Sequence, residues 1–131
     1  MPTPAGQSIG MVLKRAEQAM LRAKSAALKP AGLTLAQYIA LAELDQQPGI
    51  TGAALARACL VTPQAMMVVL KSLEEQGLIV RSPHPRHPNV LELHITDAGC
   101  EVLDAARHRA EPVERRVTDT FSSEEIGRAH V

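Results

Sequence analysis

The chain has 131 residues, 46% of them apolar, with one Phe, one Tyr and no Trp, which predicts a single domain, residues 1–131, around an aliphatic core. Its 14 basic and 14 acidic residues cancel, which excludes a protein that holds nucleic acid by bulk charge alone. No apolar run approaches the roughly 18 residues of a membrane span and no signal-peptide pattern opens the chain, so we expect a cytoplasmic protein with no membrane partner.

Two helices are predicted in the first third of the chain. Apolar residues recur at three- and four-residue steps over residues 8–28, with Ser8 as the N-cap, and a segment with Pro and Gly ends this helix. Thr34 caps a second helix, which continues to about Gln47 and has an apolar face of its own. Apolar faces of this kind pack helix against helix, in agreement with the aliphatic composition.

Residues 51–77 predict two short helices separated by a tight turn. The first occupies residues 52–59 and follows a threonine N-cap. Thr62 and the proline after it have the N-cap and first-turn signals of the second helix, residues 63–76. Gly77 then provides a left-handed C-terminal cap.

Two short β-strands, residues 78–81 and 90–95, are predicted next. Residues 82–89 are expected to form the loop between them, because their three prolines cannot donate hydrogen bonds to a neighbouring strand. A long helix, residues 97–121, follows, and we expect Pro112 to interrupt it. The order helix, turn, helix, hairpin predicts a mainly α-helical fold with a small β-hairpin wing, a winged helix-turn-helix that binds DNA.

One face of the helix at residues 63–76 is not expected to pack against the core. Four residues fall on the side of a helical wheel that faces the core: Met66, Val69, Leu70 and Leu73. A glutamine on the other side can bond an adenine edge, an alanine or valine can touch a thymine methyl, and a lysine can reach a phosphate or a guanine. An isolated helix of this kind more often has a merely solvated face, but its place between a helix-turn and a hairpin favours DNA recognition. The predicted DNA contacts of this helix are Thr62, Gln64, Ala65, Val68, Lys71 and Ser72.

The loop after the first strand supplies one more candidate contact. Arg86 lies at its predicted tip, between His84 and His87. A basic hairpin tip can enter a minor groove or lie on phosphates, and the alternative is a solvent-exposed turn stiffened by prolines. We expect DNA binding to strengthen below about pH 6.5, as the wing histidines gain charge.

Other chemistry finds no support in the sequence. The wing histidines have no cysteine or carboxylate partner at metal-ligand spacing, so no metal site is expected. Cys59 and Cys100 lie in apolar helical patterns without a neighbouring cation, which is typical of buried structural thiols. No glycine-rich phosphate loop and no arrangement of catalytic side chains is found, so we expect neither an enzyme nor a cofactor.

Several short motifs carry a family resemblance. They are Gly-Leu-Thr-Leu-Ala-Gln-Tyr (32–38), Leu55-Ala56, Thr62-Pro63-Gln64-Ala65-Met66, Leu73-Glu74-Glu75-Gln76-Gly77-Leu78 and Ile95-Thr96-Asp97-Ala98-Gly99. Together they resemble the MarR family of transcriptional regulators over residues 8–121. Each motif is weak alone, and the set in this order is quite specific.

The resemblance implies a homodimer in which helices 8–28 and 97–121 form the dimer frame and residues 51–99 form the DNA-binding module. Such dimers bind a pseudo-palindromic operator in double-stranded DNA, usually as repressors, and many release it when a phenolic or other small organic effector enters a cleft near the dimer interface. Similar wings have His-Gly-Arg where this chain has His87-Pro88-Asn89, which leaves the wing contact to Arg86. The alternative function is a winged-helix protein-interaction module that does not bind DNA.

Residues 122–131 are expected to form an irregular, non-native tail. Members of the family continue with a helix whose leucines complete the dimer, whereas Glu125-Ile-Gly-Arg-Ala-His-Val131 has no amphipathic pattern. This heptapeptide can be encoded by GAG-ATC-GGA-AGA-GCA-CAC-GTC, which contains the start of a common sequencing adapter. We expect that the gene was read into adapter and that the dimer is weaker than in a full-length relative. A genomic stop codon directly after Val131 would contradict this origin.

Overall fold

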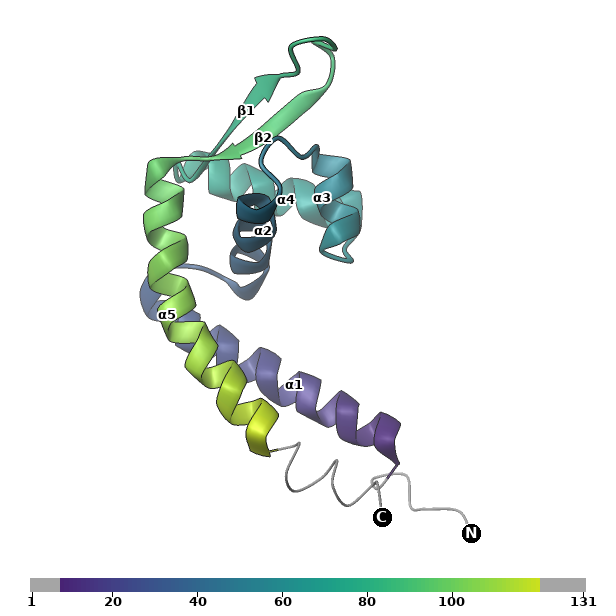
Figure 1. Cartoon of the computed structure of the whole chain (residues 1–131), viewed down its shortest axis with the longest axis vertical. Helices are drawn as coiled ribbons and strands as arrows, with labels where there is room; N and C mark the ends of the chain where they lie inside the picture. Colours follow the sequence, from purple (N-terminus) through teal and green to yellow (C-terminus); the bar gives the residue numbers. More distant parts are fainter. Residues whose placement is uncertain (1–7, 121–131) are drawn as a thin grey trace.

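The computed structural model describes residues 8–120, which form helices and one antiparallel hairpin. The elements in chain order are α1 (Ile9–Leu28), the short 3-10 helix η2 (Lys29–Ala31), α2 (Leu35–Gln46), α3 (Gly52–Ala58), α4 (Pro63–Glu75), β1 (Ile79–Pro83), β2 (Leu91–Ile95) and α5 (Asp97–Thr120). The hairpin projects beyond α3 and α4, and α5 leads away from it to lie beside α1 (Figure 1). The predicted fold class, mainly α-helical with a β-hairpin wing, is confirmed. The predicted tail, 122–131, lies outside the described residues.

Four helices begin at the predicted polar caps. The hydroxyl of Ser8 accepts the Met11 N–H at 3.2 Å, and Thr34, Thr51 and Thr62 cap α2, α3 and α4 in the same way. A side-chain oxygen at this position satisfies a first-turn N–H that has no partner inside the helix. These caps explain why the predicted helix starts are correct.

The core is aliphatic, as the composition predicts. Its largest fully buried side chains are Leu28, Leu41, Leu44, Leu55, Leu73, Ile79, Leu93, Leu103 and Val12. Burial of each leucine or isoleucine contributes about 1.5–3 kcal/mol relative to leaving it in water. The core therefore joins α2, α3, α4, the hairpin and the start of α5 into one unit that holds α4 in a fixed orientation.

Two polar links attach α5 to the rest of the chain. The Arg107 Nη2 atom lies 3.1 Å from Asp45 Oδ2 of α2, and Lys24 Nζ of α1 lies 3.2 Å from Glu114 Oε2. Both pairs are partly exposed, so each adds little stability but fixes the direction in which α5 leaves the hairpin. Through α5, the α1 arm is connected to the hairpin and to α4.

The bounds of the two wing strands differ slightly from those predicted: each strand begins one residue later, and the first also ends two residues later. β1 continues to Pro83, which pairs with Leu91, so the prediction that residues 82–89 are all loop is wrong at its first two positions. The Thr96 N–H donates to the Leu78 carbonyl, and the His84 N–H donates to the Val90 carbonyl. In an antiparallel pair, hydrogen-bonded positions alternate with positions that have no hydrogen bond. Pro83 and Leu91 are at a position without one, so the missing N–H of the proline is not needed.

Pro112 does not interrupt α5. The helix is continuous from Asp97 to Thr120, so the predicted break is wrong, although its axis bends along its length (Figure 1). Proline removes one helical hydrogen bond and favours a kink. Ala110 and Val113, on either side of it, are buried, and this packing holds the helix together through the bend.

No single helix among residues 8–120 has both the length and the apolar composition needed to cross a membrane. α3 and α4 meet these two criteria only when taken together, and the angle between them is 111°.

The turn between α3 and α4 contains a strained residue. Leu60 has a φ of 58°, in the left-handed region, and its side chain is 91% exposed. This conformation costs most L-residues about 1–2 kcal/mol, and asparagine tolerates it better. We expect Leu60→Asn to raise the free energy of unfolding by about 0.5–1 kcal/mol, measured by urea denaturation. Leu60→Ala keeps the Cβ and so serves as the control; equal stability of the two variants would contradict this explanation.

Candidate nucleic-acid interface

The two faces of α4 differ sharply in burial. Met66, Leu70 and Leu73 are at most 2% exposed and pack into the core. On the outer side Val68 is 71% exposed and Met67 is 65% exposed. Four predicted contacts share this outer surface: Gln64, Ala65, Val68 and Lys71 are all exposed. Large apolar side chains left open beside a glutamine and a lysine suit a helix that enters a major groove.

Thr62 stands at the N-terminal end of this surface. Its side-chain oxygen accepts the Ala65 N–H at 3.1 Å, so the hydroxyl hydrogen remains able to donate to a phosphate. Pro63 follows at the first helical position, where no N–H is needed. The positive end of the helix dipole adds to the attraction for an anion at this site.

Ser72 differs from the other predicted contacts on α4. It is half-buried, and its Oγ accepts hydrogen bonds from Gln37 Nε2 at 2.8 Å and from Gln76 Nε2 at 3.2 Å. Gln37 is 8% exposed and forms a capping box with Thr34. We therefore infer that Ser72 connects α4 to α2 through its hydrogen bond with Gln37. The Thr-x-x-Gln spacing at 34–37 is a capping-box signal that could have identified Gln37 in the sequence.

The wing exposes Arg86 on the loop between its strands. Within residues 8–120, neither Arg86 nor Lys71 forms an ion pair, so both charges face solvent. Arg81, by contrast, is engaged: its Nε lies 3.2 Å from Glu74 Oε2, which links β1 to the C-terminal end of α4. This link fixes the wing relative to the outer surface of α4.

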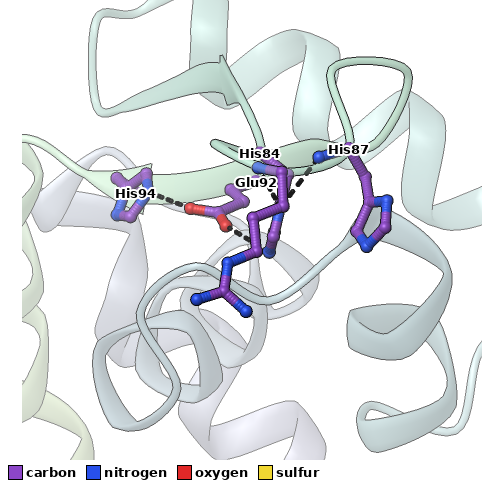
Figure 2. Close-up of polar contacts among 5 residues, drawn as sticks. His84, His87, Glu92 and His94 are labelled. Atoms are coloured by element: carbon purple, nitrogen blue, oxygen red, sulfur yellow. Dashed lines mark hydrogen bonds and ion pairs between the residues drawn. The ribbon is translucent and has the colours of Figure 1, made fainter.

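A carboxylate that the sequence pattern does not predict lies against two of the wing histidines. Glu92 lies between His84 and His94 (Figure 2), with its Oε2 atom 3.6 Å from His84 Nε2 and its Oε1 atom 3.3 Å from His94 Nε2. The expectation that these histidines lack a carboxylate partner is wrong. Glu92 and His94 share a strand face by their two-residue spacing, and the register Ser82↔Glu92 brings His84 close. Over residues 8–120, no group of three such side chains has the geometry of a metal site.

Cys59 lines a cavity of about 220 Å³ between α2, the α3–α4 turn and α4. Burial raises the pKa of its thiol, and the negative charge of Glu43 adds to this increase. The thiol therefore stays protonated, and unreactive, to a higher pH than an ordinary cysteine. The lining of the cavity is Leu35, Ala36, Ile39, Cys59, Val61, Ala65, Met66 and Val69.

This geometry gives a prediction for thiol chemistry. In a Cys100→Ser variant, we expect the alkylation rate of Cys59 by iodoacetamide to rise at higher pH in the folded chain than in urea. The urea-unfolded protein is the control, because it retains the same cysteine without the burial. Coincident rate profiles for the two states would show that burial and Glu43 do not hold the thiol in its protonated form.

Comparison with known proteins places this surface in context. The profile of the MarR family matches residues 31–87. The HTH-type transcriptional repressor Rv2887 of Mycobacterium tuberculosis is 39% identical over 107 residues, which cover 82% of this chain and 74% of the repressor. The 107 aligned residues extend beyond residues 31–87 and, out of a chain of 131, must include α4 and both wing strands.

Two solved structures are similar in fold. The complex of Rv2887 with DNA has a TM-score of 0.74 and 33% identity, covering 91% of this chain and 86% of that one. CouR from Rhodococcus jostii RHA1, bound to p-coumaroyl-CoA, has a TM-score of 0.81 and 27% identity, covering 88% and 81% of the two chains. The family profile, the identity to the repressor and the likeness in fold agree, and the chain belongs to the MarR family of transcriptional regulators.

Proposed function

We propose that this protein is a repressor that binds a pseudo-palindromic site in double-stranded DNA as a homodimer. In each copy, α4 enters the major groove and the wing lies along the neighbouring phosphates or minor groove. The DNA-binding module corresponds to residues 51–99. A regulator of this kind acts on the chromosome, so we propose a cytoplasmic location.

The observation that carries the proposal is the outer surface of α4. Gln64, Val68 and Lys71 are exposed on a helix whose opposite side is fully buried, so their positions are fixed without any role in the core. The amide of Gln64 can form two hydrogen bonds with an adenine, and the apolar side chain of Val68 can contact a thymine methyl. The cation of Lys71 can bind a phosphate or a guanine. The related repressor Rv2887 is known in complex with DNA, which supports DNA as the partner of this protein.

Apolar side chains on α1 support the homodimer. The helix buries Val12 and Leu28, but four other large apolar residues on it are exposed to solvent. They are Ile9, Met11, Leu13 and Leu21, between 38% and 53% exposed. A second copy would cover them, with residues 8–28 and 97–121 as the dimer frame. Two copies then place two recognition helices one helical turn of DNA apart, as a palindrome requires.

Because the net charge of the chain is zero, the positions of the individual DNA contacts are important. A chain with equal numbers of acids and bases gains little from non-specific attraction, so its affinity must come from contacts at defined positions. A dimer doubles those contacts on one site. This is why we expect strong discrimination between a matched palindrome and unrelated duplex.

A small organic effector is also proposed. Rv2887 has been crystallised with p-aminosalicylic acid, and CouR with p-coumaroyl-CoA. By relation to these proteins, we propose that a phenolic or other organic compound releases this protein from DNA. Release of a labelled duplex on addition of p-aminosalicylic acid, p-coumaroyl-CoA or their close analogues is the direct assay.

The proposal is tested by selecting duplexes from random DNA with the full chain. We expect the selected sites to be palindromic and to bind at least about 1,000-fold more tightly than shuffled duplex at moderate salt. We also expect the affinity to fall linearly with the logarithm of salt concentration. Failure to enrich any sequence, with equal binding to all duplexes, would contradict the proposal and favour a protein-interaction module.

A further inference from the structure

His84 organises the backbone at the tip of the wing. Its Nδ1 atom accepts the N–H of Arg86 at 3.0 Å and the N–H of His87 at 3.2 Å (Figure 2). The backbone N–H of His84 donates to the Val90 carbonyl at 2.8 Å, and the backbone N–H of Val90 donates to the His87 carbonyl at 2.8 Å. One side chain therefore closes the turn that begins the loop and presents Arg86 to solvent.

These contacts determine which ring nitrogen carries the proton. A nitrogen that accepts two N–H groups cannot itself be protonated, so the hydrogen of the neutral ring is on Nε2. Nε2 faces the Glu92 carboxylate, whose second oxygen lies 3.3 Å from His94 Nε2. The Glu92 carboxylate thus lies beside the edge of the ring that carries Nε2, 3.6 Å from it and too far for a hydrogen bond, while Nδ1 on the other edge accepts the Arg86 and His87 N–H groups.

We propose that His84, as the neutral Nε2–H tautomer, is the positioning residue for Arg86. It holds the arginine backbone in a turn that leaves the side chain exposed, and Glu92 lies next to the histidine ring. This inference rests on the proposed function, in which Arg86 contacts DNA. The effect on DNA is indirect, because the His84 ring is engaged within the wing.

Only one tautomer of the ring allows this arrangement, because a hydrogen on Nδ1 would eliminate both accepted hydrogen bonds. The groups facing the ring are Glu92 on β2, His87 with its ring centroid 5.2 Å away, and Arg86 on the same loop; His94 lies beyond Glu92.

The experiment compares His84→Ala with His84→Asn in the full chain. Asparagine offers an oxygen that can accept the same N–H groups, as in an Asx-turn, and it does not titrate. With a duplex selected from random DNA at about pH 8, we expect His84→Ala to weaken binding about tenfold and His84→Asn to bind within about twofold of the wild type. In an Arg86→Ala background, both His84 variants should have no further effect.

A readout without DNA separates this inference from the proposed function. Nitrogen-15 NMR of the imidazole at about pH 8 should show protonated Nε2 and unprotonated Nδ1, and the Arg86 amide should shift in His84→Ala but not in His84→Asn. A ring protonated on Nδ1, or an Arg86 amide that is unchanged in His84→Ala, would overturn the inference. The expected tautomer, together with an Arg86→Ala variant that binds DNA like the wild type, would overturn the role of Arg86 in the proposed function instead, and with it the positioning role.

Discussion

Replacing Gly99 with alanine is expected to lower the free energy of unfolding by on the order of 3 kcal/mol. Gly99 is buried in the first turn of α5, where a Cβ atom would overlap the Leu78 carbonyl oxygen and lie 2.6 Å from Ile95 Cγ1. The carbonyl is backbone and already accepts the Thr96 N–H at 3.0 Å, so it cannot move aside without breaking the start of the wing. The added methyl must therefore push α5 away from β1.

The same substitution at another glycine provides the control. Gly10 on α1 has no atom within 4 Å of an added Cβ, so Gly10→Ala removes flexibility without a clash and should leave stability equal or slightly higher. Urea denaturation of the two variants, followed by circular dichroism, measures the difference. Equal midpoints for Gly99→Ala and Gly10→Ala would show that the junction between wing and α5 is looser than the structure indicates.

Reversing the charge of Lys71 is expected to weaken binding to a selected duplex by about 100-fold or more. The lysine is exposed on the outer surface of α4 and has no ion-pair partner within the described part of the chain, so its charge is available to DNA. In Lys71→Glu, each copy of a dimer would bring a carboxylate against the phosphates. The salt dependence of binding should also decrease, by about one unit of slope for each lost phosphate contact.

Lys29→Glu is the matched control for this variant. It changes net charge by the same amount on an exposed lysine of η2, away from α4 and the wing. We expect it to bind DNA within about threefold of the wild type, because only long-range, salt-screened repulsion is added. Similar losses for both variants would mean that net charge, and not the position of Lys71, controls binding.

The local signals in the sequence are sufficient to predict the helices and to predict which side of α4 is exposed. Thr34, Thr51 and Thr62 each stand before a run with helical periodicity, and a cap of this kind acts within a few residues of itself. The apolar spacing of α4 likewise separates its buried side from its exposed side without knowledge of the neighbours. Five of its six predicted contacts lie exposed on α4 or at its N-cap.

Features that depend on distant segments were missed. The hydroxyl of Ser72 is engaged by Gln37, which is 35 positions away in the chain, and no local pattern indicates such a contact. The contact between His84 and Glu92 depends on the strand register. The sequence does not determine this register, because it leaves the ends of the strands uncertain. At Pro112 the packing of α5 outweighs the local preference for a break.

The most direct test of the central claim is base-specific recognition by Gln64. Binding of the wild type and of Gln64→Ala is measured on a selected palindrome and on its single-base-pair variants, changed symmetrically in both half-sites. We predict that Gln64→Ala loses about 1–3 kcal/mol of discrimination at one base pair of each half-site and keeps its discrimination elsewhere. Unchanged discrimination at every base pair, or an equal loss at all of them, would contradict the claim that the outer surface of α4 recognises DNA.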